Sequence, residues 1–284
     1  MKKILLTLMH YGSSNHEHFL TCLAEYSLYA DYALTTHVFL TEDCDLSAFP
    51  SLNIVKHVLP ASLGKAFVLE SKPVLYESRN DYDYYIYSED DVLITRENFE
   101  TFARVQSQLP LPYACGFLRY ELKPNDDYKY LLDNHPVHSI HRGGRAILKA
   151  RHRINGLDFL EPYNVHQGCH VLTREMMRYL EKNYPRYFKQ ESFYAGILEG
   201  CASDVYFNSG LVKVVPVDQV EKLLVHHLAD KYVNLQPENY TRASTPNEVR
   251  IKNVPPNFNE IGYFNVLAMK VRQVLLFLKL IDRR

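Results

Sequence analysis

The sequence predicts an α/β fold, with a mixed but mostly parallel central sheet flanked by helices. Short apolar runs alternate along the chain with stretches of helical length and periodicity, and this alternation is typical of parallel sheets. The 284 residues are 46% hydrophobic, which is enough for a large buried core. Because open α/β sheets bind ligands outside the carboxyl ends of their strands, functional residues are expected there.

Composition and charge exclude several classes of protein. The formal net charge of -1 lacks the basic excess that nucleic-acid-binding proteins use on phosphates, so no nucleic-acid partner is expected. Five scattered cysteines without a Cys-x-x-Cys pair argue against a disulfide framework and a cysteine-built zinc site. The N-terminal apolar run is broken by Thr7, and no apolar stretch reaches the ~18 residues of a transmembrane helix. These features predict a cytoplasmic protein with no transmembrane segment.

The first part of the chain predicts one α/β unit after another. An apolar run over 3–9 predicts a strand that ends at His10 and Tyr11, and a polar, Gly-containing turn leads into a helix over about 17–32. Further strands are expected over 37–40 and 54–59, and a helix that Pro73 interrupts is expected over 63–79. A strand over 83–88 then runs into three consecutive carboxylates.

The rest of the chain alternates less regularly. A helix over 98–108 precedes a region to about 160 in which loops and acceptor-binding elements are expected. A strand over 169–173, helices over 174–183 and 192–201 and a strand over 211–217 follow. Residues 233–262 predict a wrapping loop, and residues 264–281 predict an amphipathic helix.

The triplet of Glu89, Asp90 and Asp91 is the sharpest chemical signal. Three adjacent carboxylates at the end of an apolar strand repel one another, and a divalent cation relieves that repulsion. Carboxylate oxygens suit Mg²⁺ or Mn²⁺, which combine one or two protein carboxylates with substrate phosphates. The alternatives are a solvated acidic turn and a helix start with Asp at its N-cap.

The stretch from Asp81 to Phe99 resembles the metal-binding segment of GT-A fold glycosyltransferases, in the variant where Glu-Asp-Asp replaces Asp-x-Asp. The resemblance implies a GT-A (Rossmann-like) fold and a nucleotide-sugar donor whose diphosphate is bridged by Mn²⁺ or Mg²⁺. Asp91 would be the direct metal ligand, with Glu89 and Asp90 near the ribose and the sugar.

Two further segments extend the resemblance to the donor site. Lys72, with Pro73 after it, resembles the Lys-Pro helix that precedes this strand in such enzymes, which implies a nucleotide or diphosphate contact. An ordinary solvated helix lysine is the alternative. Gly168 begins a segment similar to the loop beside the donor sugar. His10 and Tyr11 would lie beside the nucleoside, or in a loop packed for stability.

The segment around Asp204 resembles the x-Glu-Asp element of the family, whose last carboxylate is the catalytic base of inverting members. Ser203 stands where Glu is commoner. Asp204 would take the proton from the acceptor hydroxyl, whereas the alternative is an N-cap Asp on a following helix. Glu191 and Glu199 are reserve candidates for the base.

His226 and His227 stand at about the place where GT-A enzymes carry a late metal-ligand histidine, and Lys231 could meet the diphosphate. Either imidazole could complete the metal shell. A histidine pair in an apolar setting also occurs as packing or hydrogen-bonded structure, and that alternative stays open.

The predicted organisation is a GT-A-like catalytic domain over 1–232, with a nucleotide-binding half over about 1–110 and an acceptor-binding half over about 111–232. A C-terminal wrapping segment and helix follow over 233–284. The helix is expected to pack on the domain, with peripheral membrane contact as the alternative.

The implied function is transfer of one sugar from a nucleotide-diphosphate sugar, with a UDP-sugar favoured, to a hydroxyl of a glycan or other acceptor. The reaction would be metal-dependent and inverting. The first alternative is a metal-dependent nucleotidyltransferase, although no Gly-rich phosphate loop stands near the N-terminus. The second is a non-catalytic carbohydrate- or anion-binding module that uses the Tyr-rich surface and the basic run over 142–153.

Overall fold

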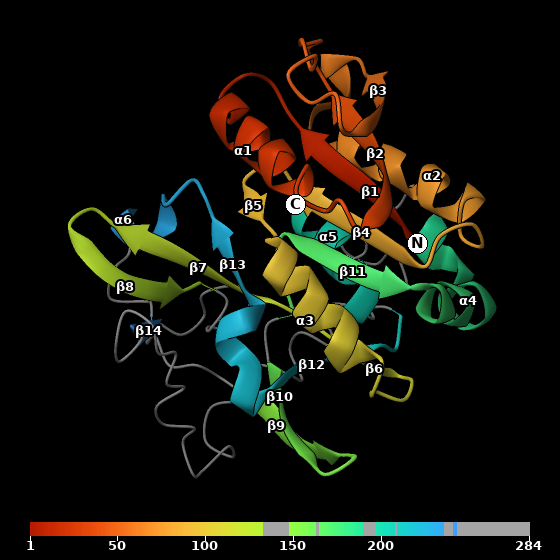
Figure 1. Cartoon of the computed structure of the whole chain (residues 1–284), viewed down its shortest axis with the longest axis vertical. Helices are drawn as coiled ribbons and strands as arrows, with labels where there is room; N and C mark the ends of the chain where they lie inside the picture. The colour runs from red at the N-terminus through yellow and green to blue at the C-terminus, as the bar shows by residue number, and fades with distance from the viewer. Residues whose placement is uncertain (133–147, 163–164, 190–196, 208, 236–240, 243–284) are drawn as a thin grey trace, which may run out of the picture.

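The structure is a computed structural model that describes residues 1–132, 148–162, 165–189, 197–207, 209–235 and 241–242 (Figure 1). Within this part of the chain, the central sheet has the strand order β11-β4-β1-β2-β3. Its strands are β1 (Lys2–His10), β2 (Tyr32–Leu40), β3 (Asn53–Val58), β4 (Tyr84–Glu89) and β11 (Cys169–Thr173). β1 pairs in parallel with β2 and β4, β2 pairs in parallel with β3, and β11 runs antiparallel to β4. The predicted α/β class with a mostly parallel sheet is confirmed.

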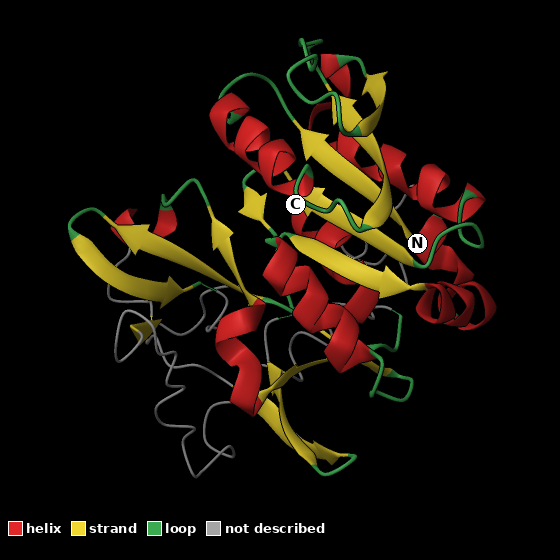
Figure 2. Cartoon of the chain, viewed as in Figure 1, coloured by secondary structure: helices red, strands yellow, loops and turns green. Residues whose placement is uncertain are grey.

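Helices cover both faces of this sheet (Figure 2). Alternate residues of β1, such as Leu6 and Leu5, are both fully buried but belong to different core clusters, as expected for a parallel strand covered on both sides. One face packs on α1 (His16–Tyr26) and α3 (Arg96–Gln106). The other packs on η1 (Ala61–Glu70), α2 (Ser71–Glu77), α4 (Arg174–Asn183), η2 (Pro185–Phe188) and α5 (Ile197–Phe207).

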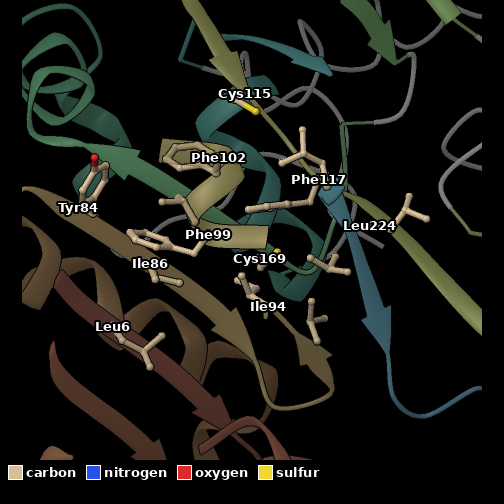
Figure 3. Packing of buried hydrophobic residues seen from close by; sticks show 14 of the residues in the cluster. Leu6, Tyr84, Ile86, Ile94, Phe99, Phe102, Cys115, Phe117, Cys169 and Leu224 are labelled. Atoms are coloured by element: carbon tan, nitrogen blue, oxygen red, sulfur yellow. The ribbon is translucent and has the colours of Figure 1, made fainter. Parts of the chain in front are cut away.

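The core between the sheet and α3 is aromatic. Figure 3 shows Phe99 and Phe102 of α3 among the buried side chains of this cluster, together with Ile86 of β4 and Phe117. α3 starts at Thr95, whose hydroxyl accepts from the Asn98 backbone N–H at 3.2 Å while its own N–H donates to Asn98 Oδ1 at 2.8 Å. This capping box fixes the helix start just beyond the carboxylate triplet.

The region between about 111 and 160 is β-rich in its described residues, so the expectation of loops there is wrong. Its strands are β6 (Tyr113–Cys115), β7 (Leu118–Lys123), β8 (Asp126–Leu131), β9 (Leu148–Ile154) and β10 (Leu157–Pro162). Asn155 and Gly156, with φ of 50° and 83°, form the two-residue turn between β9 and β10. Asn-Gly is the preferred hairpin sequence for such a turn, and this signal was missed.

Two smaller sheets carry these strands and those that follow. One has the order β6-β12-β10-β9 and the other β14-β8-β7-β13-β5, both counted over the described residues. The added elements are β5 (Val92–Leu93), β12 (Val212–Pro216), η3 (Val217–Leu223), β13 (Leu224–His227), α6 (Tyr232–Leu235) and β14 (Thr241–Arg242). β13 pairs with both β7 and β5, and this pairing brings His227 beside the carboxylate triplet.

Several predicted boundaries are wrong. The first helix ends at Tyr26, and Tyr32 already begins β2 opposite Lys2. The break in the next helical stretch lies at Gly64, whose φ is 52°, because Pro73 falls in the first turn of α2, where proline is tolerated. α5 runs on to Phe207, so its C-terminal half was missed.

Other predictions lie outside the described residues, among them the amphipathic helix over 264–281, the first half of the basic run (142–147) and the reserve candidate Glu191. None of the helices that the structure describes is long and apolar enough to span a lipid bilayer.

Candidate functional site

A pocket of ≈ 330 Å³ opens where β1 and β4 end, at the edge of the sheet where ligands were expected. It brings together several predicted site residues, namely Tyr11, Glu89, Asp90, Asp91 and His227. The other lining residues are Met9, Ser14, Asn15, Phe67, Val68, Arg119, His166, Leu198, Glu199, Lys231 and Tyr232.

Glu89 is the last residue of β4, and Asp90 and Asp91 form the turn between β4 and β5. The alternative of a helix N-cap is therefore wrong, because the capping residue of the next helix is Thr95. Asp90 and Asp91 are 6% and 5% exposed, which also rules out a fully solvated acidic turn. Buried carboxylates need hydrogen bonds or charge partners.

Asp91 is joined to His227 and, through it, to Glu121. His227 Nε2 lies 3.2 Å from Asp91 Oδ2, and its Nδ1 lies 2.6 Å from Oε1 of Glu121, which is fully buried. Glu121 Oε2 also accepts from the Val233 backbone N–H at 2.6 Å. The glutamate therefore fixes the imidazole ring so that Nε2 points at Asp91.

The pKa values in this group follow from these contacts. Burial opposes the charged forms of both partners, but the hydrogen bond between them outweighs it. The pKa of Asp91 is lowered by His227, and the pKa of His227 is raised by Asp91 and Glu121. Contact with two acidic side chains thus favours the charged form of the His227 imidazole.

Asp90 has a separate set of partners. Its Oδ2 lies 2.6 Å from His10 Nδ1, and its Oδ1 accepts from Asn15 Nδ2 at 3.0 Å. Burial raises the pKa of Asp90, and the bond to His10 opposes that rise. His10 is 3% exposed and stacks on Phe19 with ring centroids 4.4 Å apart. His10 thus holds Asp90 from behind and does not line the pocket.

Glu89 faces Arg119 and Gly168. Its Oε1 is buried without a hydrogen-bond partner, and burial followed by the nearby Asp91 raises the pKa of Glu89 to about 8. Gly168 has a φ of +62°, and a Cβ there would lie 2.7 Å from Val92 Cγ2 and 3.3 Å from Glu89 Oε2. The position therefore requires glycine, both for its backbone angle and for the close approach of Glu89.

The opposite part of the pocket is apolar and aromatic. Tyr11, which is 47% exposed, packs on Phe67 of η1 with ring centroids 5.5 Å apart. Near Asp91, Tyr232 stacks on His227 with ring centroids 5.4 Å apart, and the Lys231 ammonium lies 5.1 Å from the Tyr232 ring centre. The pocket thus offers an aromatic side and a charged side to one ligand.

Lys72 and Asp204 lie together away from the pocket lining. Lys72 Nζ is 3.4 Å from Asp204 Oδ2, and each side chain is 2% exposed. Asp204 lies inside α5, so the alternative of an N-cap on a following helix is wrong. The structure does not place either residue at the pocket surface, although their predicted roles require contact with substrate.

His226 points differently from His227, since neighbours on a strand face opposite sides. Its Nε2 lies 3.0 Å from Asp230 Oδ1, and its ring stacks on Tyr120 with centroids 4.8 Å apart. It is not among the lining residues. The two histidines that the sequence left equivalent therefore have different surroundings.

Sequence reasoning missed Arg119 and Glu121. Both stand on β7, on the same face of the strand because they are two residues apart, and both are buried. Charged residues at alternate positions of a short strand indicate a polar inner face, which was the available signal. Asn15 and His166 carried no signal beyond their place in polar loops.

The donor set fits a divalent cation of the Mg²⁺ or Mn²⁺ type. Among the described residues, no group of three or more His, Cys, Asp or Glu side chains is arranged to enclose a metal ion. Asp91 and His227 would supply two ligands, and Mg²⁺ or Mn²⁺ commonly takes its remaining ligands from water and phosphate. A carboxylate on the far nitrogen of the histidine is the usual support of a metal-ligating imidazole.

No family model and no curated protein matches the chain. Solved structures that resemble it include one of S. aureus TarS, a glycosyltransferase, with a TM-score of 0.41 and 12% identity over 75% of this chain and 35% of that chain. Another is S. aureus TarS 1–349, with a TM-score of 0.38 and 9% identity over 75% and 57% of the two chains. This chain thus spans about a third and just over half of their lengths. Similarity this low assigns no function.

Proposed function

We propose that the protein is a glycosyltransferase that moves one sugar from a nucleotide-diphosphate sugar, preferably a UDP-sugar, to a hydroxyl of a glycan or other acceptor. The observation that carries the proposal is the hydrogen-bonded series from Glu121 through His227 to Asp91. Asp91 and His227 line a pocket that also contains aromatic side chains. The pair consists of a carboxylate and an imidazole that a second carboxylate orients, and the pocket beside it has space for a nucleoside.

In the proposed complex, Asp91 and Nε2 of His227 would hold Mn²⁺ or Mg²⁺. Such a cation would supply positive charge beside the departing diphosphate. Glu121 keeps the imidazole oriented, and its carboxylate favours the tautomer with the proton on Nδ1 once Nε2 has a metal partner. His226 is the less suitable ligand because Asp230 and Tyr120 hold it outside the lining.

The remaining lining residues divide between the parts of the donor. Tyr11 and Phe67 provide aromatic surface for the nucleobase, while Asp90 and Glu89 face the ribose and the sugar. Lys231 and Arg119 supply positive charge for the diphosphate on the same side as Asp91. Under this assignment Lys72 makes no direct donor contact, and His10 acts through Asp90.

Calorimetric titration of UDP and GDP, with Mn²⁺ and then with EDTA, tests the proposal. Metal-dependent binding of one nucleotide is expected, and Asp91→Asn should abolish it. Product analysis with UDP-sugars separates sugar transfer, which releases UDP, from nucleotidyl transfer, which releases pyrophosphate. Binding of neither nucleotide in either condition would contradict the proposal and favour the non-catalytic module.

A further inference from the structure

Helix α5 carries two carboxylates that face different surroundings. Glu199 and Asp204 are five residues apart, which on an α-helix places them about 140° apart around the axis. Glu199 is exposed and lines the pocket, whereas Asp204 is 2% exposed and does not. The two residues therefore have different access to a ligand.

Asp204 is committed to a buried ion pair. Lys72 Nζ lies 3.4 Å from its Oδ2, and the same ammonium lies 5.5 Å from the ring centre of Tyr187, which is also buried. A general base has to come within hydrogen-bond distance of the hydroxyl that it deprotonates. Protonation of Asp204 would also remove the negative charge that stabilises the buried ammonium of Lys72.

Lys72 and Asp204 instead connect two elements of the pocket wall. Lys72 follows η1, which supplies Phe67 and Val68 to the pocket, and Asp204 belongs to α5, which supplies Leu198 and Glu199. Their ion pair therefore ties α5 to α2, the helix that follows η1.

Glu199 has a polar neighbourhood in the pocket. Ser203, four residues further along α5 and thus on the same helix face, has its hydroxyl 3.0 Å from His166 Nδ1. His166 lines the same pocket as Glu199. The segment that enters β11 and the first turns of α5 thus place an imidazole and a carboxylate on one side of the pocket.

We propose that Glu199, and not Asp204, is the catalytic base for the acceptor, and that Asp204 forms with Lys72 a buried structural ion pair between α5 and α2. This rests on the proposed transferase function. In the step, the acceptor O–H bond breaks and its proton goes to the Glu199 carboxylate. The oxygen's electron pair forms the bond to the anomeric carbon while the bond from that carbon to the diphosphate oxygen breaks, and that electron pair leaves with the nucleoside diphosphate.

The test compares Glu199→Gln with Asp204→Asn by UDP release from UDP-glucose, UDP-galactose, UDP-N-acetylglucosamine and UDP-N-acetylgalactosamine, with Mn²⁺ and water as the acceptor. Glu199→Gln should lower kcat at least ~100-fold, the scale of a lost general base. The KM and Tm of this variant should be unchanged. Asp204→Asn should lower Tm and keep kcat within a few-fold for the folded protein.

A charge-free replacement, Lys72→Met with Asp204→Leu, covers the case in which Asp204→Asn fails to fold. The Tm of this double variant should return toward the wild-type value, and its kcat should equal that of the wild type. Loss of ~100-fold in kcat in this folded double variant, or wild-type kcat in Glu199→Gln, would overturn the inference. The inference would also be overturned if the wild-type protein bound UDP with Mn²⁺ but released no UDP from any of these donors. If the wild-type protein bound no nucleotide, the proposed function itself would have failed.

Discussion

Two clusters of buried titratable groups each contain a histidine, and the pKa values of the two histidines are shifted in opposite directions. At the pocket, His227 stands between the carboxylates of Asp91 and Glu121, and its pKa is raised. On β11 of the central sheet, His170 lies 2.9 Å from the Tyr187 hydroxyl and 3.3 Å from the Ala202 carbonyl, and burial lowers its pKa to about 3. Burial is common to both, so the partners decide which imidazole is charged.

The comparison separates a binding site from a structural cluster. Asp91 and His227 line the pocket, and Glu121 is buried behind the imidazole. His170 and the ion pair of Lys72 and Asp204 are buried between α2, α5 and the sheet and do not line the pocket. Substitutions in the first cluster should therefore act on binding, and those in the second on folding.

The largest effect is expected in the sealed cluster. Lys72→Met removes the ammonium from Asp204, and breaking a buried pair in this way costs about 3–5 kcal/mol in the free energy of unfolding. Urea unfolding at pH 7 measures the loss. Adding Asp204→Leu to Lys72→Met should restore most of it; a double variant as unstable as the single one would contradict a role in holding α5.

A smaller effect, on binding, is expected from Glu121→Gln. Loss of the carboxylate behind a metal-ligating histidine typically weakens metal affinity by about 10- to 100-fold. Titration of Mn²⁺ in the presence of UDP measures it, and the matched change His226→Gln should leave the affinity unchanged. Equal losses in the two variants would mean that the carboxylate behind His227 has no special part.

The pH dependence of stability should follow His170. Its folded pKa of about 3 lies below the ordinary value near 6.5, so the unfolded chain takes up a proton that the native protein excludes. Stability is therefore unaffected by this group above pH 6.5 and falls as pH drops from 6.5 toward 3, by up to about 1.4 kcal/mol per pH unit. His170→Gln should flatten that slope in urea unfolding at pH 7, 6 and 5; an unchanged slope would show that other groups carry it.

The smallest effect is expected for Tyr187→Phe, which removes the hydroxyl from His170 Nε2. A buried hydrogen bond of this kind contributes about 1 kcal/mol. Thermal or urea unfolding measures the change, and UDP binding should be unaffected because neither residue lines the pocket. A tenfold loss of nucleotide affinity would show that the two clusters are coupled.

The sequence predicted the carboxylates that one strand carries and, through the resemblance, His227, but it missed Glu121 and Arg119, which strand pairing brings to the site. Glu89, Asp90 and Asp91 follow a buried strand in sequence, so their place at the sheet edge could be inferred. Glu121 and His227 are 106 residues apart and meet only because β13 pairs with β7. Periodicity describes one element at a time and does not give the pairing between distant strands.

The same limit explains the carboxylates of α5. The predicted helix stopped at 201, before Asp204, so the pattern could not show that this residue lies inside a helix with Lys72 beside it. The position of Glu199 in the pocket depends on how α5 packs against η1, which sequence periodicity also leaves open. The parallel sheet and its ligand-binding edge, in contrast, followed from local patterns alone.

The central claim is that His227, oriented by Glu121, and Asp91 form the cation-dependent nucleotide site. Calorimetric titration of UDP in Mn²⁺ with His227→Gln and His226→Gln, two neighbours on one strand, tests it most directly. The account predicts that His227→Gln loses most metal-dependent binding, while His226→Gln binds like the wild type. Equal binding by both variants, or loss only in His226→Gln, would contradict it.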